Sequence, residues 1–212
     1  MENPYQPPAS SVELPAMPVG ELKNPRKLAL VAVGLYGISL VAEIGDFLAR
    51  KYLEKRLQHI HEQFDTAASG PGLLEWVMLV LGLASAVVYL IWKYRAAVNA
   101  RILDASAMTV SPAMAVGSYF IPFVFFVVPY RAMAQIARVT LGNASGVGLW
   151  WACHIGMMLL GMAIGFHEGL ASPSAWAGLL GYLSLAVSVI TFLISAWLVM
   201  KITRVQAARC AP

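Results

Sequence analysis

Charge is the scarcest feature of this sequence. Aspartate, glutamate, lysine and arginine make up only 12% of the 212 residues, whereas 59% are hydrophobic. A soluble domain carries about 25% charged residues, so this chain lacks the charge for an ordinary water-facing surface. The composition indicates an integral membrane protein. The formal net charge of +4 is small and gives no indication of a nucleic-acid partner.

Cysteine and the common catalytic motifs are nearly or wholly absent. Cys153 and Cys210 are far apart and form no Cys-x-x-Cys motif, which argues against a disulfide framework or a redox centre. The sequence contains no phosphate-binding loop, no glycine-rich dinucleotide motif, no Gly-x-Ser-x-Gly elbow and no His-Glu-x-x-His motif. We therefore expect a protein that is not an enzyme, with no cofactor and no bound metal.

Four long apolar runs dominate the sequence. Each reaches the roughly 20 residues that a helix needs to span the hydrocarbon core. Backbone groups in lipid must be hydrogen-bonded within the chain, and no segment alternates as a barrel strand does, so we predict an all-α integral membrane protein. The four runs are Leu28–Ala49, Gly72–Trp92, Gly146–Phe166 and Ser174–Met200.

The flanking segments set the expected domain organisation. Residues 1–22 hold five prolines and few large apolar residues, so they are predicted to form a disordered cytoplasmic tail. Residues 23–205 form a single helical membrane domain. Residues 206–212 are expected to be a cytoplasmic C-terminal tail.

A fifth apolar stretch, Ser111–Tyr130, is broken by prolines. Ser111 is a suitable helix N-cap, and Pro112 is a suitable first helical residue. Pro122 removes a backbone donor and interrupts that helix. Pro129 then begins a short amphipathic helix, which we expect at the inner headgroup layer.

Positive charge favours a re-entrant path for Ala113–Val128 over a fifth span. If this segment returns to the side it left, eleven lysines and arginines lie on one side of the membrane and four on the other; if it crosses, the split is nine against six. The positive-inside rule favours the first arrangement. We predict four transmembrane helices plus a proline-broken re-entrant or interfacial segment, with five spans as the alternative. Both termini are then cytoplasmic.

A re-entrant path places a condition on the segment. Non-helical backbone at membrane depth must be buried in protein or line a wet cavity. We therefore expect the proline-broken segment to be packed among the four helices and not to face lipid.

Several short motifs follow one another in a characteristic order between residues 92 and 151. They are Trp92-x-Tyr94-Arg95-Ala96, Asn99, Ser111-Pro112, Ala115-x-Gly117-x-x-Phe120-Ile121-Pro122, Pro129-Tyr130-x-x-Met133 and Trp150-Trp151. This order and spacing resembles the bacterial membrane-protein family catalogued as domain of unknown function 4328, over the chain from about residue 72 to the end of the last apolar run. The resemblance implies a multi-pass bacterial membrane protein and no particular activity; we expect it in the inner membrane.

Four ionisable residues within the predicted spans are candidate site residues. Glu43 and Asp46 are three apart and share a helix face, Glu75 is predicted at a similar depth, and His154 lies in the predicted span Gly146–Phe166. Carboxylates at one depth suit a cation or a proton. A small transporter or channel, using Glu43 and the Pro122 break, is therefore the alternative function. In the simpler interpretation the outer acids reach water, Glu43 pairs with a neighbour and the imidazole bonds to a neighbouring helix.

Arg95, Asn99 and Arg131 form a candidate lipid-binding or structural motif with the prolines of the broken segment. Arg95 and Asn99 are four apart and put a planar donor fork and an amide on one helix face. They suit the carbonyls freed at the Pro122 break, or a lipid phosphate, and we favour the first role. Arg131, on the amphipathic helix, suits anionic headgroups.

Small and hydroxylated residues recur at helical spacing in the last two runs. Such residues let membrane helices approach closely, which indicates helix packing, a homo-oligomer or a membrane-protein partner, with a polar pathway as the alternative. We accordingly expect a non-enzymatic structural or regulatory role through lipid or protein contacts. The residues are Gly161, Gly165, Ser184, Ser188, Thr191 and Ser195.

Overall fold

The computed structural model describes residues 21–57, 73–169 and 175–210, and every regular element in those ranges is helical. This confirms the all-α class; the tail over residues 1–20 lies outside the described residues. Five helical stretches are long and apolar enough to cross a membrane, and one of them is Val124–Leu141. The elements are α1 (Arg26–Leu57), α2 (Leu73–Leu103), α3 (Pro112–Gly117), η1 (Ser118–Phe120), η2 (Val124–Phe126), α4 (Val128–Leu141), α5 (Val147–Gly169) and α6 (Ala175–Arg209).

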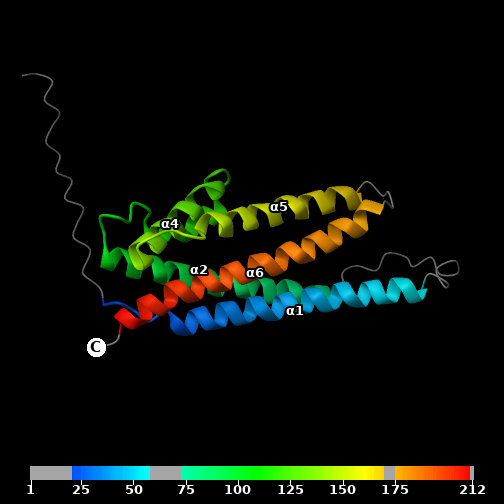
Figure 1. Ribbon diagram of the computed structural model, residues 1–212, viewed down its shortest axis with the longest axis horizontal. Coiled ribbons are helices and arrows are strands. Elements are labelled where there is room, and N and C mark those ends of the chain that lie inside the picture. Colours follow the sequence, from blue (N-terminus) through cyan, green and yellow to red (C-terminus); the bar gives the residue numbers. More distant parts are fainter. Residues whose placement is uncertain (1–20, 58–72, 170–174, 211–212) are drawn as a thin grey trace, which may run out of the picture.

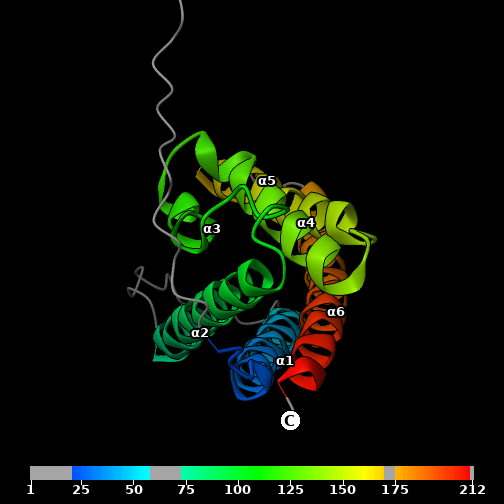
Figure 2. The ribbon, with the colours of Figure 1, turned by 90° about the vertical axis from the view of Figure 1, so that its left-hand side faces the viewer.

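Four long helices, α1, α2, α5 and α6, form an elongated bundle (Figure 1). α1 packs against α2 and α6, and α5 packs against α6. A shorter unit, Pro112–Leu141, comprises α3, η1, η2 and α4, and we call it the hairpin. Seen along the bundle, the hairpin covers the side between α2 and α5 (Figure 2). It lies toward the end of the bundle where α1 begins and α6 ends, which we call the terminal end.

A buried polar network fixes the terminal end. The Gln206 side chain on α6 donates to the Ala96 carbonyl and to the Thr140 hydroxyl, both at 3.1 Å, and accepts from the Asn99 amide at 3.1 Å. Asn99 also bonds the backbone N–H and carbonyl of Lys23 at 3.1 and 2.8 Å. The ends of α2 and α4 are therefore both held against α6, so the hairpin begins and finishes at the terminal end.

The same network moves the predicted boundary of the C-terminal tail. α6 continues to Arg209, and Gln206 is completely buried. The helix therefore extends through residues 206–209, the first four residues of the expected tail. Hydrogen bonds from one buried amide to three neighbours supply the reason for this additional turn.

Two prolines start the hairpin helices as their positions predicted. Ser111 is the N-cap of α3, where its hydroxyl accepts from the Met114 N–H at 3.2 Å, and Pro112 is the first helical residue. Pro129 occupies the first turn of α4. The helix is interrupted near Pro122, and Phe123 has a positive φ of 63°.

The hairpin tip corrects the expectation that the broken segment is packed away from lipid. Phe120, Phe123 and Phe126 are 74%, 85% and 47% exposed. The two arms are partly buried below the tip, where Ser118 and Pro129 are buried. The tip therefore presents phenyl rings on the outside of the bundle.

Local hydrogen bonds explain how a non-helical tip tolerates this exposure. The Val124 N–H donates to the Pro122 carbonyl at 2.7 Å, and the Phe125 N–H donates to the Ile121 carbonyl at 3.0 Å. The indole of Trp151 donates to the Phe126 carbonyl at 3.0 Å. Satisfied carbonyls carry little desolvation penalty in apolar surroundings, so this backbone does not require burial.

The terminal network yields a stability prediction. We expect Gln206→Ala to lower the free energy of unfolding in detergent by about 1–3 kcal/mol, because it removes three hydrogen bonds and leaves buried partners unpaired. Arg204→Ala, an exposed change on the same helix, serves as the control and should have little effect. Equal stability of the two variants would show that the network does not hold the ends of α2 and α4.

Candidate functional site

Lys93 is a buried cation that joins α2 to both arms of the hairpin. Its side chain is completely buried. The ammonium donates to the Tyr119 hydroxyl on η1 at 2.8 Å and to the Pro129 carbonyl at the start of α4 at 3.1 Å. Each arm of the hairpin is thus anchored to one atom of α2.

The surroundings of this ammonium are aromatic. Its nitrogen lies 4.6 Å from the centroid of the Tyr119 ring and 5.6 Å from the Trp150 ring. No carboxylate among the described residues forms an ion pair with Lys93. Cation–π attraction offsets some of the cost of burial, but a buried charge with no counterion remains expensive.

A cavity of about 480 Å³ lies beside this anchor, between α1, α2, α5 and α6. Tyr119, which accepts the hydrogen bond from Lys93, lines it. Its lining also includes three residues with exposed surface, Gly82 and Ala86 on α2 and Phe120 on η1, which mark its mouth on the side between α2 and the hairpin. The volume lies in the range of roughly 300–1,000 Å³ that small-molecule sites occupy.

Two unpaired hydroxyl groups lie in the wall of the cavity. Among the described residues, the buried side-chain nitrogen and oxygen atoms without a hydrogen-bond partner are the hydroxyl oxygens of Tyr89, Ser118 and Ser195. Tyr89 and Ser195 line the cavity, whereas Ser118 does not. Unpaired buried hydroxyls are rare and costly, so their concentration here is the strongest sign of a binding site.

His154, a predicted site residue, contributes an acceptor to the cavity wall. Its Nδ1 lies 2.8 Å from the Trp150 carbonyl, one turn earlier in α5. A carbonyl only accepts, which assigns the proton of the neutral ring to Nδ1 and leaves Nε2 as an acceptor. The expected hydrogen bond to a neighbouring helix is replaced by one within α5, where the imidazole packs at a tilt against the Trp150 ring and parallel to the Trp151 ring.

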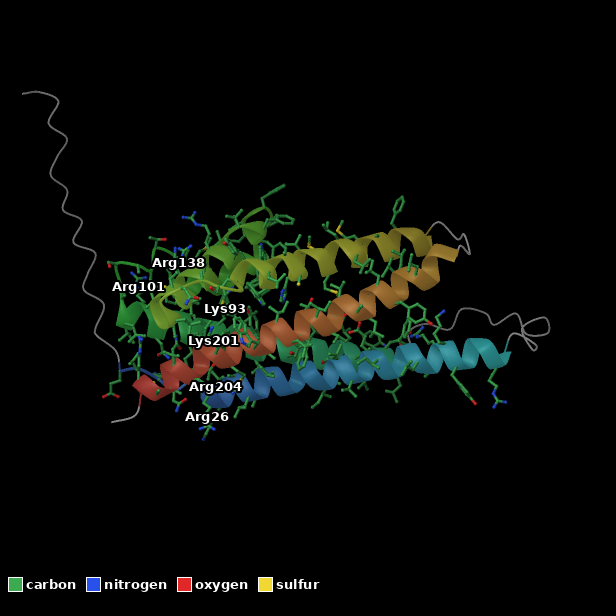
Figure 3. All side chains as sticks on the ribbon, viewed as in Figure 1. Arg26, Lys93, Arg101, Arg138, Lys201 and Arg204 are labelled. Atoms are coloured by element: carbon green, nitrogen blue, oxygen red, sulfur yellow. The ribbon has the colours of Figure 1, made fainter. Side chains whose placement is uncertain are left out.

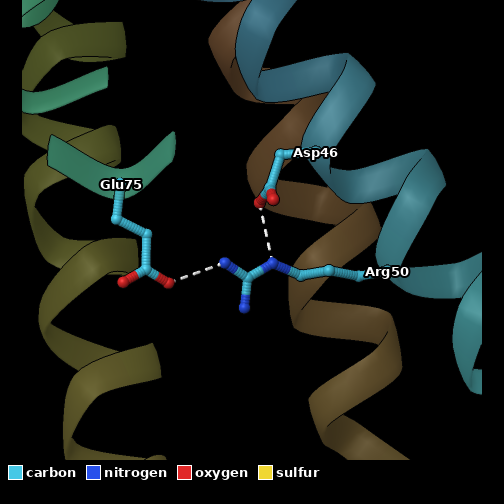
Figure 4. A network of polar contacts seen from close by, with 3 residues as sticks. All are labelled: Asp46, Arg50 and Glu75. Atoms are coloured by element: carbon cyan, nitrogen blue, oxygen red, sulfur yellow. Dashed lines mark hydrogen bonds and ion pairs between the residues drawn. The ribbon is translucent and has the colours of Figure 1, made fainter. Parts of the chain in front are cut away.

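The three carboxylates do not converge on one site. The Ser188 hydroxyl on α6 donates to Glu43 on α1 at 2.9 Å, which is the neighbour pairing expected for this residue. Arg50 bridges Asp46 and Glu75 at 2.8 and 2.9 Å (Figure 4). No group of three histidines, cysteines or acids among the described residues is arranged to hold a metal ion.

Arg95 and Asn99 bond to a different segment from the one predicted. Asn99 holds Lys23, and Arg95 reaches the Asn24 carbonyl at 3.5 Å. Both therefore face the chain entering α1, whereas the carbonyl at Pro129 receives its donor from Lys93.

The small residues of α5 and α6 separate into two environments. Ser188, Thr191 and Ser195 are buried within the bundle, and Ser184 on the same face is half-buried. Gly161 and Gly165 are exposed, and an added Cβ would meet nothing within 4 Å. The α6 face thus packs inside the chain, while the two glycines leave an open surface on α5.

Basic side chains form a belt around the terminal end, which we call the basic collar (Figure 3). Within it, Arg26 and Arg204 line a hollow of about 470 Å³ between the start of α1 and the end of α6. Leu30 and Met200 form apolar parts of its wall. The collar comprises Arg26, Arg101, Arg138, Lys201 and Arg204.

Sequence reasoning missed Lys93, which it counted only as a cytoplasmic charge. The helical spacing of the residues after Lys93 could have indicated that its side chain is buried. Ala96, Ala97 and Ala100 lie three, four and seven residues after Lys93 and so share its face, and all three are buried. A lysine on a face of small residues is surrounded by closely packed neighbours and cannot reach water easily.

Comparison with known proteins identifies one family. A family model described as Domain of unknown function (DUF4328) matches residues 60–204. This match covers more than half of the chain and confirms the resemblance drawn from its Ser-Pro, Phe-Ile-Pro and Pro-Tyr motifs. No curated protein and no solved structure matches the chain.

Replacing the buried cation tests its anchoring role. In Lys93→Met, we expect the amides of the hairpin around Tyr119 to exchange with deuterium about tenfold faster, because the Pro129 carbonyl loses its donor. The melting temperature in detergent should fall little, since an uncompensated buried charge is removed at the same time. Lys201→Met, which loses a cation at 4.6 Å from the Trp197 ring, is the control. Unchanged hairpin exchange would refute the anchor.

Proposed function

We propose that this chain, which belongs to the DUF4328 family, is a non-enzymatic four-span protein of the bacterial cytoplasmic membrane that binds anionic phospholipid at its cytoplasmic end. Its described helices include five stretches apolar enough to span a bilayer. Four of them are the long helices of the bundle, and the hairpin is a re-entrant element. Both termini lie on the cytoplasmic side.

The position of the hairpin ends supports four spans. Thr140, at the end of α4, accepts a hydrogen bond from Gln206, which also accepts from Asn99 near the end of α2. The Arg209 guanidinium reaches the Thr140 carbonyl at 3.5 Å. A segment that leaves and returns to one end of a bundle does not need to cross the membrane.

The hollow between Arg26 and Arg204 carries the lipid-binding proposal. Two guanidinium groups from different helices suit a phosphodiester, since each presents several donors in a fixed plane. Leu30 and Met200 continue the hollow with apolar surface, on which an acyl chain can lie. A phosphate at the headgroup layer and a chain directed into the bilayer together match a glycerophospholipid.

Basic side chains on α4 strengthen this attraction. Arg131 and Arg138 are exposed on α4, whose opposite face is buried against the bundle. Each basic residue near an anionic leaflet contributes about 1 kcal/mol. Arg138, one turn from the end of α4 where Thr140 contacts Gln206, therefore lies toward the lipid phosphates of the inner headgroup layer.

Cysteine accessibility tests the topology. In a variant lacking Cys153 and Cys210, single cysteines at Ala105 and Asn143, which are exposed on the two sides of the hairpin, should react with an impermeant maleimide only after the cells are permeabilised. A cysteine at Arg56, in the last turn of α1 at the opposite end of the bundle, should react in intact cells. Labelling of positions 105 and 143 from opposite sides would establish a fifth span.

Charge removal tests the lipid site. In nanodiscs, Arg26→Gln with Arg204→Gln should weaken binding of phosphatidylglycerol by about 2 kcal/mol, or roughly thirtyfold, and should reduce its salt dependence. Arg56→Gln at the other end is the matched control. Equal phosphatidylglycerol affinity in the double variant and the control, measured by native mass spectrometry, would reject the hollow as a headgroup site.

A further inference from the structure

We propose that the 480 Å³ cavity binds a free fatty acid, with its carboxylate at the Tyr119 and Tyr89 hydroxyls and its chain in the apolar part of the cavity. This site uses no residue of the lipid hollow at the terminal end, so its ligand is additional to the phospholipid proposed there. The inference depends on three observations: the uncompensated cation, the unpaired hydroxyls and the shape of the cavity.

The first observation concerns charge. The Lys93 ammonium is completely buried and has no ion-pair partner among the described residues. It has three N–H donors, and two of them serve Tyr119 and Pro129. An anion bound close by would supply the missing countercharge, in surroundings where the attraction between unit charges is stronger than in water.

The second observation is a set of available donors. The Tyr119 hydroxyl accepts from Lys93 at 2.8 Å, which leaves its own hydrogen to donate. The Tyr89 hydroxyl is buried and contacts the Tyr119 hydroxyl, but the geometry of this contact falls short of a hydrogen bond. Two phenolic donors backed by an ammonium form a charge-assisted site for a carboxylate, which accepts several hydrogen bonds at once.

The third observation is the form of the cavity. Most of the remaining lining is aliphatic or aromatic, including Val33, Phe192 and Val199. Its mouth at Gly82 and Ala86 lies on exposed surface of α2, so a molecule dissolved in the bilayer can enter from the side. A single chain suits this volume, whereas a two-chained phospholipid has a much larger headgroup and twice the apolar bulk.

The cavity matches a ligand that has both an apolar chain and an acidic group. A free carboxylate in an apolar site needs a countercharge and donors, and Lys93 with the two tyrosines supplies both. A neutral chain lacking the carboxylate would leave the ammonium uncompensated. We therefore assign the site to single-chain carboxylic acids and not to neutral esters or hydrocarbons.

The test uses a diazirine-bearing palmitic acid and its methyl ester as probes. The full chain in phosphatidylcholine nanodiscs is illuminated with each probe, and labelled peptides are identified by mass spectrometry. We expect the acid to label residues around the cavity on α2, α5 and α6, with at least tenfold less labelling by the ester at equal concentration. Equal labelling by acid and ester, or no cavity labelling by the acid, would overturn the proposal.

Two variants locate the site. Ala86→Trp fills the mouth and should abolish labelling, whereas Val87→Trp, one residue on and not in the cavity wall, should not. Tyr89→Phe with Tyr119→Phe should lower the affinity for the acid about tenfold or more and leave the ester unchanged. Circular dichroism and gel filtration confirm that each variant is folded. Undiminished acid labelling in folded Ala86→Trp would contradict the assignment.

Discussion

The buried ammonium of Lys93 is the interaction on which the rest of the arrangement depends. It holds η1 through the Tyr119 hydroxyl and α4 through the Pro129 carbonyl. With both arms of the hairpin fixed, η1 places Tyr119 and Phe120 in the wall of the cavity. The same cation explains why this cavity suits an anion, because no carboxylate in the described residues balances it.

The hairpin also shows how a chain can break a helix and still satisfy the hydrogen bonds of its backbone. Proline-broken backbone loses intrahelical donors and must find others. Here three sources serve the carbonyls: tight turns at the tip, the indole of Trp151 and the ammonium of Lys93. Since these groups satisfy the backbone, the phenyl rings of the tip are free to face outward.

The sequence predicted the helical class and the starts of the hairpin helices, because span length, N-caps and prolines act locally. Ser111, Pro112 and Pro129 perform the expected roles. The sequence did not predict which residues on different helices contact one another. Arg95 and Asn99 face the entry to α1 because of the rotation of α2 about its axis. Hydropathy does not reveal that rotation. The small side chains of Ala96, Ala97 and Ala100 do indicate it, because they mark the buried face of α2 that carries Lys93.

The most direct test of this account is the distance between the Lys93 ammonium and the Pro129 carbonyl in a lipid bilayer. Solid-state NMR on a chain labelled with 15N at lysine side chains and 13C at proline carbonyls measures their dipolar coupling, with Lys93→Met to identify the signal. A coupling that matches the 3.1 Å nitrogen–oxygen contact is predicted. Absence of that coupling, with the ammonium extended to the headgroup layer, would contradict the anchor and the cavity that depends on it.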